Sequence, residues 1–390
     1  MAGRMYPGSK AMDPKEYQAP EAGAVVLTRE GYHAFVPALL PPTIEYDGGV
    51  VRALSDADAA LGELSGRGAL LPNPHLLISP LVRREAVLSS RIEGTQASIA
   101  EVLLAEMAGD ASPQQAADIT EVRNYVDALE HGIERLATLP LSLRLVRELH
   151  ERLMRGARGG HAAPGEFRRS QNWIGPPGST IESAPYVPPP VDRMQELLVD
   201  WERFLHLRGA LPDLVQCAVL HEQFEAIHPF LDGNGRVGRL LITLFLIERG
   251  RLSRPLLYLS QFFESNRDEY YERLQRVRTV GDWRGWVLYF LRGVAETADA
   301  ATRAVTELMS LREEWRRRLA PQARAAMLVD ALFVNPYVTV RRASAELGTS
   351  RPTARKAIQA LCEEGILSDV SRSRARPVYV AEDVLRLVSA

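Results

Sequence analysis

The sequence is poor in cysteine and has no long apolar runs. Its two cysteines, Cys217 and Cys362, lie far apart inside helical patterns, which argues against a disulfide framework and against a cysteine-based zinc site. No apolar stretch is long enough to span a bilayer, and the first residues lack the apolar core of a signal peptide. We therefore expect a soluble protein of the reducing cytoplasm that has no membrane partner.

An excess of charge of one sign is also absent. Lys and Arg together number 47, and Asp and Glu number 49, so the net charge is −2. The global charge therefore points neither to nucleic acid nor to a membrane surface. Lysine is rare, and nearly all basic residues are arginines. We attribute this bias to genomic base composition and not to function.

Helical periodicity dominates the chain and predicts a mainly α fold. The length of 390 residues suits about two or three domains. Residues 1–22 are rich in Gly, Pro and Lys, and we expect them to be disordered. The patterns divide the chain into an N-terminal region, a helical domain, a helical connector and a C-terminal module: residues 1–110, 111–297, 298–320 and 321–390.

The strongest chemical signal lies in residues 228–239, His-Pro-Phe-Leu-Asp-Gly-Asn-Gly-Arg-Val-Gly-Arg. Apolar helical patterns flank this stretch, so a glycine-rich loop opens a helix. Such a loop points bare N–H groups and the positive end of the helix dipole at its ligand, which suits phosphate. His228 is a titratable base, and Asp232 is an oxygen ligand of the kind that Mg²⁺ takes beside phosphates. Arg236 and Arg239 share a helix face and can bind phosphate oxygens.

Each of these pieces alone has an ordinary structural explanation, since a lone histidine is usually structural and Gly-Asn-Gly is a common turn. No Gly-Lys-Ser/Thr follows a strand here, which excludes a P-loop. The stretch resembles the signature of the Fic (filamentation induced by cAMP) family, HxFx(D/E)GNGRxxR, and matches every specified position. The resemblance covers roughly residues 80–290.

This resemblance implies a Fic-type helical core and a protein adenylyltransferase, which moves AMP from ATP to a Tyr, Thr or Ser hydroxyl of a protein substrate or of itself. It implies His228 as the catalytic base and Asp232 as the Mg²⁺ ligand. Tyr270 and Tyr271 would flank the adenine, although paired aromatic residues are more often core. Transfer of phosphate or phosphocholine is an alternative, but the intact Gly-Asn-Gly-Arg favours AMP. The implied nucleotide-binding residues are Asp232, Gly233, Asn234, Gly235, Arg236, Arg239, Gln223, Tyr270 and Tyr271.

A second motif, Ser-Ser-Arg-Ile-Glu-Gly from Ser89, closes a helix that Pro80 is expected to begin and that runs to about Glu93. A glutamate in the last turn opposes the helix dipole and calls for a cationic partner; alone it would be a solvated carboxylate. In one class of Fic proteins an inhibitory helix carries (S/T)xxxE(G/N), which this stretch fills. The resemblance implies that Glu93 pairs with Arg239 and excludes the ATP γ-phosphate. A Glu93-dependent reverse reaction, the removal of AMP, stays open.

The pattern changes between the helices that precede the signature. Residues 167–175 alternate as a strand does, and residues 184–190 are typical of a proline-rich edge strand. A lone hairpin offers a free edge to an extended peptide, or it is a structural arm. In Fic proteins a hairpin flap at this place docks the target segment. We therefore assign the flap to five consecutive residues: Ser183, Ala184, Pro185, Tyr186 and Val187.

The C-terminal module has the outline of a winged helix-turn-helix. Its expected recognition helix and wing are basic, which predicts DNA binding. Winged helices also serve as protein-binding or dimer modules, so a protein partner or a homodimer is an alternative. In another alternative, the chain is mainly a DNA-binding regulator whose nucleotide site is a sensor. The residues of the helix and the wing are Arg351, Thr353, Arg355, Lys356, Arg372, Arg374 and Arg376.

Overall fold

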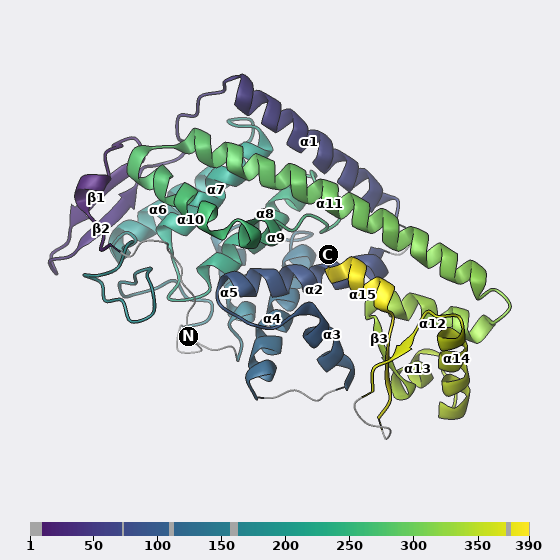
Figure 1. Cartoon of the computed structure of the whole chain (residues 1–390). Coiled ribbons are helices and arrows are strands. Elements are labelled where there is room, and N and C mark those ends of the chain that lie inside the picture. Colours follow the sequence, from purple (N-terminus) through teal and green to yellow (C-terminus); the bar gives the residue numbers. More distant parts are fainter. Residues whose placement is uncertain (1–9, 72–73, 109–112, 157–162, 372–375, 390) are drawn as a thin grey trace.

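The fold is mainly helical, as the sequence predicts. Two long helices, α1 (Gly48–Ala69) and α11 (Trp283–Arg318), lie side by side along one edge of the molecule (Figure 1). None of the helices in the described ranges has both the length and the apolarity needed to cross a membrane. The structure is a computed structural model and describes residues 10–71, 74–108, 113–156, 163–371 and 376–389.

The two long helices run parallel. At their common starting end, Arg284 of α11 forms a 2.6 Å ion pair with Asp47, the residue that caps α1. Near the other end of α1, Arg67 donates a 3.1 Å hydrogen bond to Thr306 of α11. Beyond this point α11 continues unbroken, so the connector expected at residues 298–320 is the second half of the same helix.

The central helices are α7 and α8. Every residue of α7 from Leu214 to Ile227 is buried, so the helix lies inside the protein. The buried set includes five polar residues: Gln216, His221, Glu222, Gln223 and Glu225. The loop that joins α7 to α8, residues 228–233, begins the signature stretch. The helices between α1 and α11 are α2 (Pro74–Ile92), α3 (Ile99–Ala108), α4 (Pro113–Arg135), α5 (Leu143–Leu153), α6 (Val191–His206), α7 (Asp213–Ile227), α8 (Asn234–Glu248), α9 (Ser260–Ser265) and α10 (Arg267–Val280).

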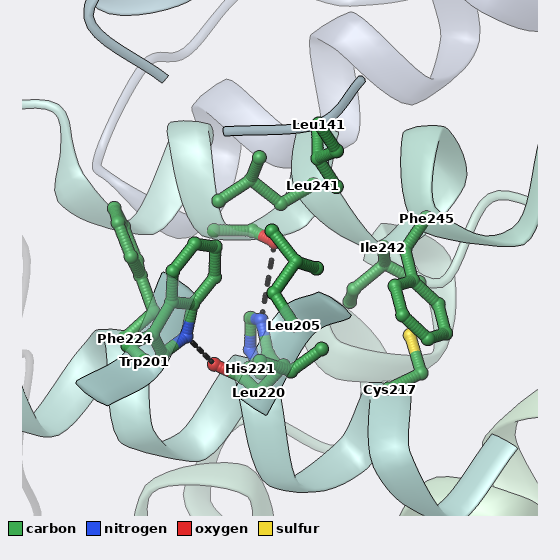
Figure 2. A pocket seen from close by; sticks show the side chains of 11 residues that line it. Leu141, Trp201, Leu205, Cys217, Leu220, His221, Phe224, Leu241, Ile242 and Phe245 are labelled. Carbon is green, nitrogen blue, oxygen red and sulfur yellow. Dashed lines mark hydrogen bonds between the residues drawn. The ribbon is translucent and has the colours of Figure 1, made fainter. Parts of the chain in front are cut away.

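A small apolar pocket lies between α6, α7 and α8, and hydrogen bonds around it hold these helices together (Figure 2). In it, the Trp201 indole donates to the Leu220 carbonyl (2.9 Å), and His221 Nδ1 donates to the Gly238 carbonyl (3.2 Å). His221 Nε2 then accepts from the Tyr270 hydroxyl (2.9 Å). Burial lowers the pKa of His221 to about 3, so its ring stays neutral. This histidine ties α7 to α8 and α10 directly behind the signature loop.

The expectation of disorder is wrong for residues 10–22. Their backbone finds acceptors in the helical core: the Met12 N–H donates to Ala184 O (2.9 Å), and the Gln18 N–H donates to Thr279 O (2.7 Å). These hydrogen bonds compensate for the low apolar content of the segment. It leads into an antiparallel hairpin of β1 (Gly23–Leu27) and β2 (His33–Pro37), preceded by a single 3₁₀ turn, η1 (Pro14–Glu16).

The expected start of α2 is also wrong. The helix begins at Pro74, and Pro80 lies inside it. The missing N–H of Pro80 removes one backbone hydrogen bond, but buried neighbours such as Leu81 pack into the core and offset that loss. The helix ends at Ile92, and Gly94 with a φ of 102° turns the chain away, close to the predicted end.

Residues 163–190 do not form the two regular strands that the sequence predicts. A single antiparallel bridge joins Ile174 to Tyr186, and no longer strand occurs in this part of the described chain. On the outer side, the Phe35 N–H of β2 donates to Val187 O (2.9 Å), so the N-terminal hairpin covers the edge that was expected to be free. The cause of the irregularity is a set of prolines without N–H groups: Pro176, Pro177, Pro185, Pro188, Pro189 and Pro190.

The C-terminal part combines short helices with an antiparallel sheet of order β3-β5-β4. It packs against α2 and α3, where the Asn335 amide donates to the Leu103 carbonyl (3.0 Å) (Figure 1). Two predicted wing residues, Arg372 and Arg374, lie outside the described residues. The elements are α12 (Ala323–Val334), β3 (Tyr337–Thr339), α13 (Val340–Glu346), α14 (Arg351–Glu363), β4 (Ser368–Asp369), β5 (Val378–Val380) and α15 (Glu382–Ser389).

Candidate active site

The loop between α7 and α8 makes a sharp reversal. His228 adopts a left-handed conformation (φ 49°, ψ 61°), and Gly233 does the same before α8 (φ 78°). For a residue other than glycine such a conformation costs about 1–3 kcal/mol, so surrounding contacts must hold it. One contact lies within the loop: the Asn234 amide accepts from the Phe230 N–H and donates to the Phe230 carbonyl, both at 2.8 Å. The loop is therefore preset before any ligand arrives.

A cleft that is open to solvent lies in front of this loop. Its polar groups come mainly from the α7–α8 loop and the start of α8, and its aromatic groups come from α10 and residues 173–175. The lining residues are Glu93, Trp173, Ile174, Gly175, Glu225, His228, Leu231, Asp232, Gly233, Asn234, Gly235, Arg239, Tyr270, Tyr271, Leu274 and Arg278.

The imidazole of His228 is set up to accept a proton. Its Nδ1 lies 3.3 Å from the Glu225 carbonyl. A carbonyl only accepts, so Nδ1 carries the proton and Nε2 keeps a free electron pair. Burial lowers the pKa of His228 to about 3, helped by the positive charges of Arg168 and Arg278. The ring is therefore neutral at physiological pH.

The contact expected between Glu93 and Arg239 is present. Arg239 Nη2 donates to Glu93 Oε1 (2.8 Å), and Arg239 Nε donates to Ser89 Oγ (2.8 Å). Burial opposes ionisation of Glu93, but the charge and hydrogen bond of Arg239 outweigh it and hold the pKa of the carboxyl below its usual value. The carboxylate lies over Gly235, where any side chain would collide with it. An anion thus occupies the first turn of α8.

The N-terminus of α8 has unused capacity for anions. Gly233 supplies no capping side chain, so the first N–H groups of the helix are available to a ligand. Below them, Nε and Nη1 of Arg236 find no hydrogen-bond partner among the described residues; the nearest carboxylate belongs to Glu121, 3.6 Å from Nη1. Buried donors without acceptors are unusual; these two lie beneath the loop and outside the lining of the cleft.

A metal ion would have one protein carboxylate at this loop. The Asp232 side chain is half exposed, and its Oδ1 accepts from the Gly233 N–H (2.6 Å). In the described ranges, no cluster of three or more His, Cys, Asp or Glu side chains is arranged to hold a metal. This donor set suits an ion such as Mg²⁺, which takes one or two carboxylates together with substrate phosphates and water.

Some residues that the sequence singled out do not line the cleft. The Gln223 amide donates to the Ala38 carbonyl (2.9 Å) at the N-terminal hairpin, Arg236 lies beneath the loop, and Ser89 reaches the cleft only through Arg239. In the flap at residues 183–187, Ser183 is exposed, and three residues are fully buried: Ala184, Tyr186 and Val187.

The structure adds His150 of α5, which the sequence analysis missed. Its ring stacks on Phe230 at 3.7 Å. His150 Nδ1 accepts from the Gly165 N–H (2.9 Å), so Nε2 carries the proton and donates to the Asp232 carbonyl (3.0 Å). Burial lowers the pKa of His150 to about 4, so this arrangement persists at neutral pH. An inward position on an amphipathic helix is ordinary core in a sequence, and no pattern could have marked it.

Two more missed residues come from outside the signature. Trp173 lines the cleft and is 43% exposed. Its ring therefore offers a large aromatic surface that a ligand or partner can cover. Arg278 of α10 also lines the cleft, forms a buried 3.0 Å ion pair with Glu222 and lies over the Tyr186 ring. An arginine on a strongly charged helix is normally solvated, so the sequence offered no signal for it.

Comparison with known proteins agrees with this geometry. Residues 51–134 match the family described as Fic/DOC family N-terminal, and residues 140–246 match the Fic/DOC family. A protein adenylyltransferase Fic from Aedes aegypti is 32% identical over 173 residues, 43% of this chain and 30% of that protein. The one from Drosophila erecta is 30% identical over 175 residues, 44% of this chain and 31% of that protein. The match thus spans less than a third of these relatives.

Solved structures share the fold. A Fic family protein from Desulfovibrio desulfuricans G20 superposes with a TM-score of 0.56 at 22% identity, covering 87% of this chain and 98% of that chain. A Fic domain containing signaling protein from Bacteroides thetaiotaomicron VPI-5482 gives a TM-score of 0.50 at 17% identity, covering 66% of this chain and 95% of that chain. At these identities the likeness concerns the fold alone.

Proposed function

The chain belongs to the Fic/DOC family over residues 51–134 and 140–246, and on that premise we propose that it is a protein adenylyltransferase. It would transfer AMP from ATP to a Tyr, Thr or Ser hydroxyl of a protein and release pyrophosphate. The observation that carries the proposal is one cleft that combines a neutral imidazole at His228, the carboxylate of Asp232 and the uncapped start of α8.

In this reaction His228 is the general base. Its Nε2 takes the proton of the target hydroxyl while the hydroxyl oxygen forms a bond to the α-phosphorus. The bond between the α-phosphorus and the bridging oxygen breaks, and pyrophosphate leaves with that electron pair. The negative charge of bound ATP raises the pKa of His228 above its value of about 3 in the free protein, toward the range in which a base works best.

The phosphates would be held by the start of α8 (Gly233, Asn234 and Gly235) and by Arg236 and Arg239. Stabilisation of charge is the main contribution of a protein to such a transfer. Asp232 would hold Mg²⁺, which, when bound, neutralises charge on the α- and β-phosphates. Tyr270 and Tyr271 would flank the adenine from α10. Gln223, which the resemblance places near the nucleotide, would act outside the cleft, because its amide donates to the Ala38 carbonyl.

Glu93 would inhibit the enzyme. Its carboxylate accepts a hydrogen bond from the guanidinium of Arg239 and lies over Gly235. There it would compete with the ATP γ-phosphate for the same donors and repel it. Ser89 would keep Arg239 in this arrangement by accepting from Nε. The reverse reaction is a second candidate, because Glu93 lines the cleft together with His228 and Asp232, and a carboxylate there could activate water to remove AMP.

The position of the label on ATP tests the proposal. We expect the Glu93→Gly variant, incubated with Mg²⁺, to incorporate label from α-phosphate-labelled ATP and none from γ-phosphate-labelled ATP. AMP transfer retains the α-phosphate and discards the other two with pyrophosphate. Incorporation of the γ-label would instead identify a phosphotransferase, and a protein that takes up neither label would contradict nucleotide transfer altogether. Autoradiography of the separated protein is the measurement.

The protein substrate would approach along residues 173–175, which line the cleft in front of the largely buried flap at residues 183–187. Trp173 and Gly175 line the cleft beside His228, so an extended segment lying against them would bring its hydroxyl to the imidazole. The bridge between Ile174 and Tyr186 joins this strip to the flap, which stiffens it as a docking surface.

A winged helix with DNA as its partner is a second candidate function for the C-terminal part. One observation favours it: α14 buries Ala354, Ile358 and neighbouring apolar residues, while its opposite face exposes Arg351, Arg355 and Lys356. A basic helix face of this kind suits phosphate contacts in a DNA groove. Thr353 lies beside that face, and Arg376 is exposed at the end of the wing region.

Charge reversal on α14 tests DNA binding. We expect the variant with Arg351, Arg355 and Lys356 all changed to Glu to bind a mixed-sequence DNA duplex about tenfold or more weakly than the parent at low salt, because phosphate contacts dominate such binding. Arg386→Glu on α15 reverses one basic, exposed residue outside this face. It is the control for charge reversal elsewhere on the surface and should bind as the parent does. Fluorescence anisotropy is the measurement. Equal affinity of the two variants would favour a protein-binding module.

A further inference from the structure

Two residues from the segment before α6 hold the backbone of the signature loop, mainly through their side chains. Arg168 Nε donates to the His228 carbonyl (3.0 Å), and the Arg168 N–H donates to the Pro229 carbonyl (2.9 Å). The Asn172 amide donates to the same His228 carbonyl (3.2 Å) and to the Phe230 carbonyl (2.8 Å). Three successive carbonyls around the left-handed residue are therefore bound by this segment.

The guanidinium of Arg168 is buried, and its residue is only 2% exposed. Its other hydrogen bonds in the described part of the chain also go to backbone carbonyls, including those of Pro189 (2.5 Å) and Ser170 (3.4 Å). Carbonyls do not neutralise a charge, so Arg168 brings an uncompensated positive charge to the back of the imidazole. Burying an arginine whose guanidinium binds the carbonyls of a strained loop costs free energy. This cost points to a role in positioning that loop.

We propose that Arg168, assisted by Asn172, is a positioning residue for the adenylyl transfer: it fixes the left-handed turn at His228 so that Nε2 faces the target hydroxyl. This inference rests on the proposed function. Neither residue lines the cleft, so neither is expected to touch the nucleotide. Their effect reaches the reaction only through the orientation and the charge state of the imidazole.

The charges that face His228 come from four places. Arg168 of the segment before α6 and Arg278 of α10 lower the pKa of His228, in addition to burial; the Glu225 carbonyl and Glu93 raise it. The Glu225 carboxylate on the same helix lies 3.9 Å from Nδ1. Removing the charge of Arg168 therefore moves the pKa of His228 upward, whereas changing Asn172 leaves it in place. This difference separates the effect on the orientation of the imidazole from the effect on its charge state.

The experiment compares three variants in the Glu93→Gly background: Arg168→Gln, Arg168→Lys and Asn172→Ala. The rate of self-labelling is followed at increasing ATP concentrations and across pH. Arg168→Gln is expected to lower the saturating rate about a hundredfold through misplacement of the base, with the half-saturating ATP concentration little changed and the acid limb of the pH profile moved to higher pH. Arg168→Lys and Asn172→Ala are expected to slow the reaction about tenfold and leave that limb in place.

The matched control is Arg169→Gln, since Arg169 is the next residue, is exposed and forms an ion pair with Glu166 at 2.8 Å. It should leave rate and pH profile unchanged. If Arg168→Gln behaves as this control does, the proposal is wrong. If Arg168→Gln and Asn172→Ala lose activity only in proportion to unfolded protein measured by circular dichroism, the role is structural and the proposal also fails.

A second readout does not depend on the reaction. Titration of the His228 ring signals by NMR in the full chain should give a higher pKa for Arg168→Gln than for Arg169→Gln. If the Glu93→Gly parent takes up no label while this shift is present, the proposed function fails and the contact between Arg168 and His228 stands. If the parent is active and no shift or rate change occurs, the positioning role alone is overturned.

Discussion

Replacing Glu93 by glycine raises the rate of self-adenylylation by about tenfold to a hundredfold. The reason is the hydrogen bond from Arg239 to Glu93 at 2.8 Å, in a site where the arginine side chain is 2% exposed. A hydrogen bond between charged partners contributes about 1.5–3 kcal/mol, and each 1.4 kcal/mol is a factor of ten in the population of the free arginine. Once released, Arg239 can bind the γ-phosphate. Incorporation of α-labelled ATP in the presence of Mg²⁺ measures the change.

The control for this change is Glu101→Gln, because Glu101 is an exposed carboxylate at the start of α3 and should not alter the rate. A rise in label could also come from a lost reverse reaction. Wild-type protein added to prelabelled Glu93→Gly protein separates the two cases, because only a de-AMPylase removes the label. An unchanged rate for Glu93→Gly would contradict the inhibitory role.

Changing His228 to alanine, in the Glu93→Gly background, abolishes labelling within detection. General base catalysis contributes about a hundredfold to ten-thousandfold, and no other described group with a free proton-accepting nitrogen lines the cleft. Nucleotide binding should persist, since the start of α8, Arg236 and Arg239 are untouched. Labelling assays and calorimetric titration with ATP measure the two properties separately.

His206→Ala serves as the control, because His206 is an exposed residue at the end of α6. It should label at the parental rate. Full labelling by the His228→Ala variant would mean that another group takes the proton, and the assignment of the base would then be wrong. Loss of both labelling and ATP binding would instead indicate that the loop itself had collapsed.

The signature loop and its anion-binding helix start could be predicted because their chemistry is local. His228, Asp232 and the glycines lie within a few residues of one another, so their spacing alone places them at one helix end. The pairing of Glu93 with Arg239 spans 146 residues, and only the family resemblance joined them in advance. Helical periodicity likewise predicted a mainly helical fold, since helices such as α5 and α6 carry their buried apolar residues at helical spacing.

The supporting residues could not be predicted, because their role depends on distant backbone atoms. His150 donates to a carbonyl 82 residues away, and Arg168 donates to one 60 residues away. No pattern in a sequence records which carbonyl a side chain reaches. The regular hairpin expected at residues 167–190 does not form, for a related reason. Alternation predicts a strand, but the prolines and the contact of β2 with Val187 decide how far the pairing extends.

Because the C-terminal part packs on α2, its position is coupled to that of Glu93. One side of α2 lies against α4 and α9, and another lies against α12 and α15, while the residue after its end binds Arg239. If α2 moves when the Glu93 carboxylate is displaced, its contacts with α4 and α9 and its contacts with α12 and α15 must both change. By thermodynamic reciprocity, a ligand on the C-terminal part that alters ATP affinity through α2 has its own affinity altered by ATP by the same factor.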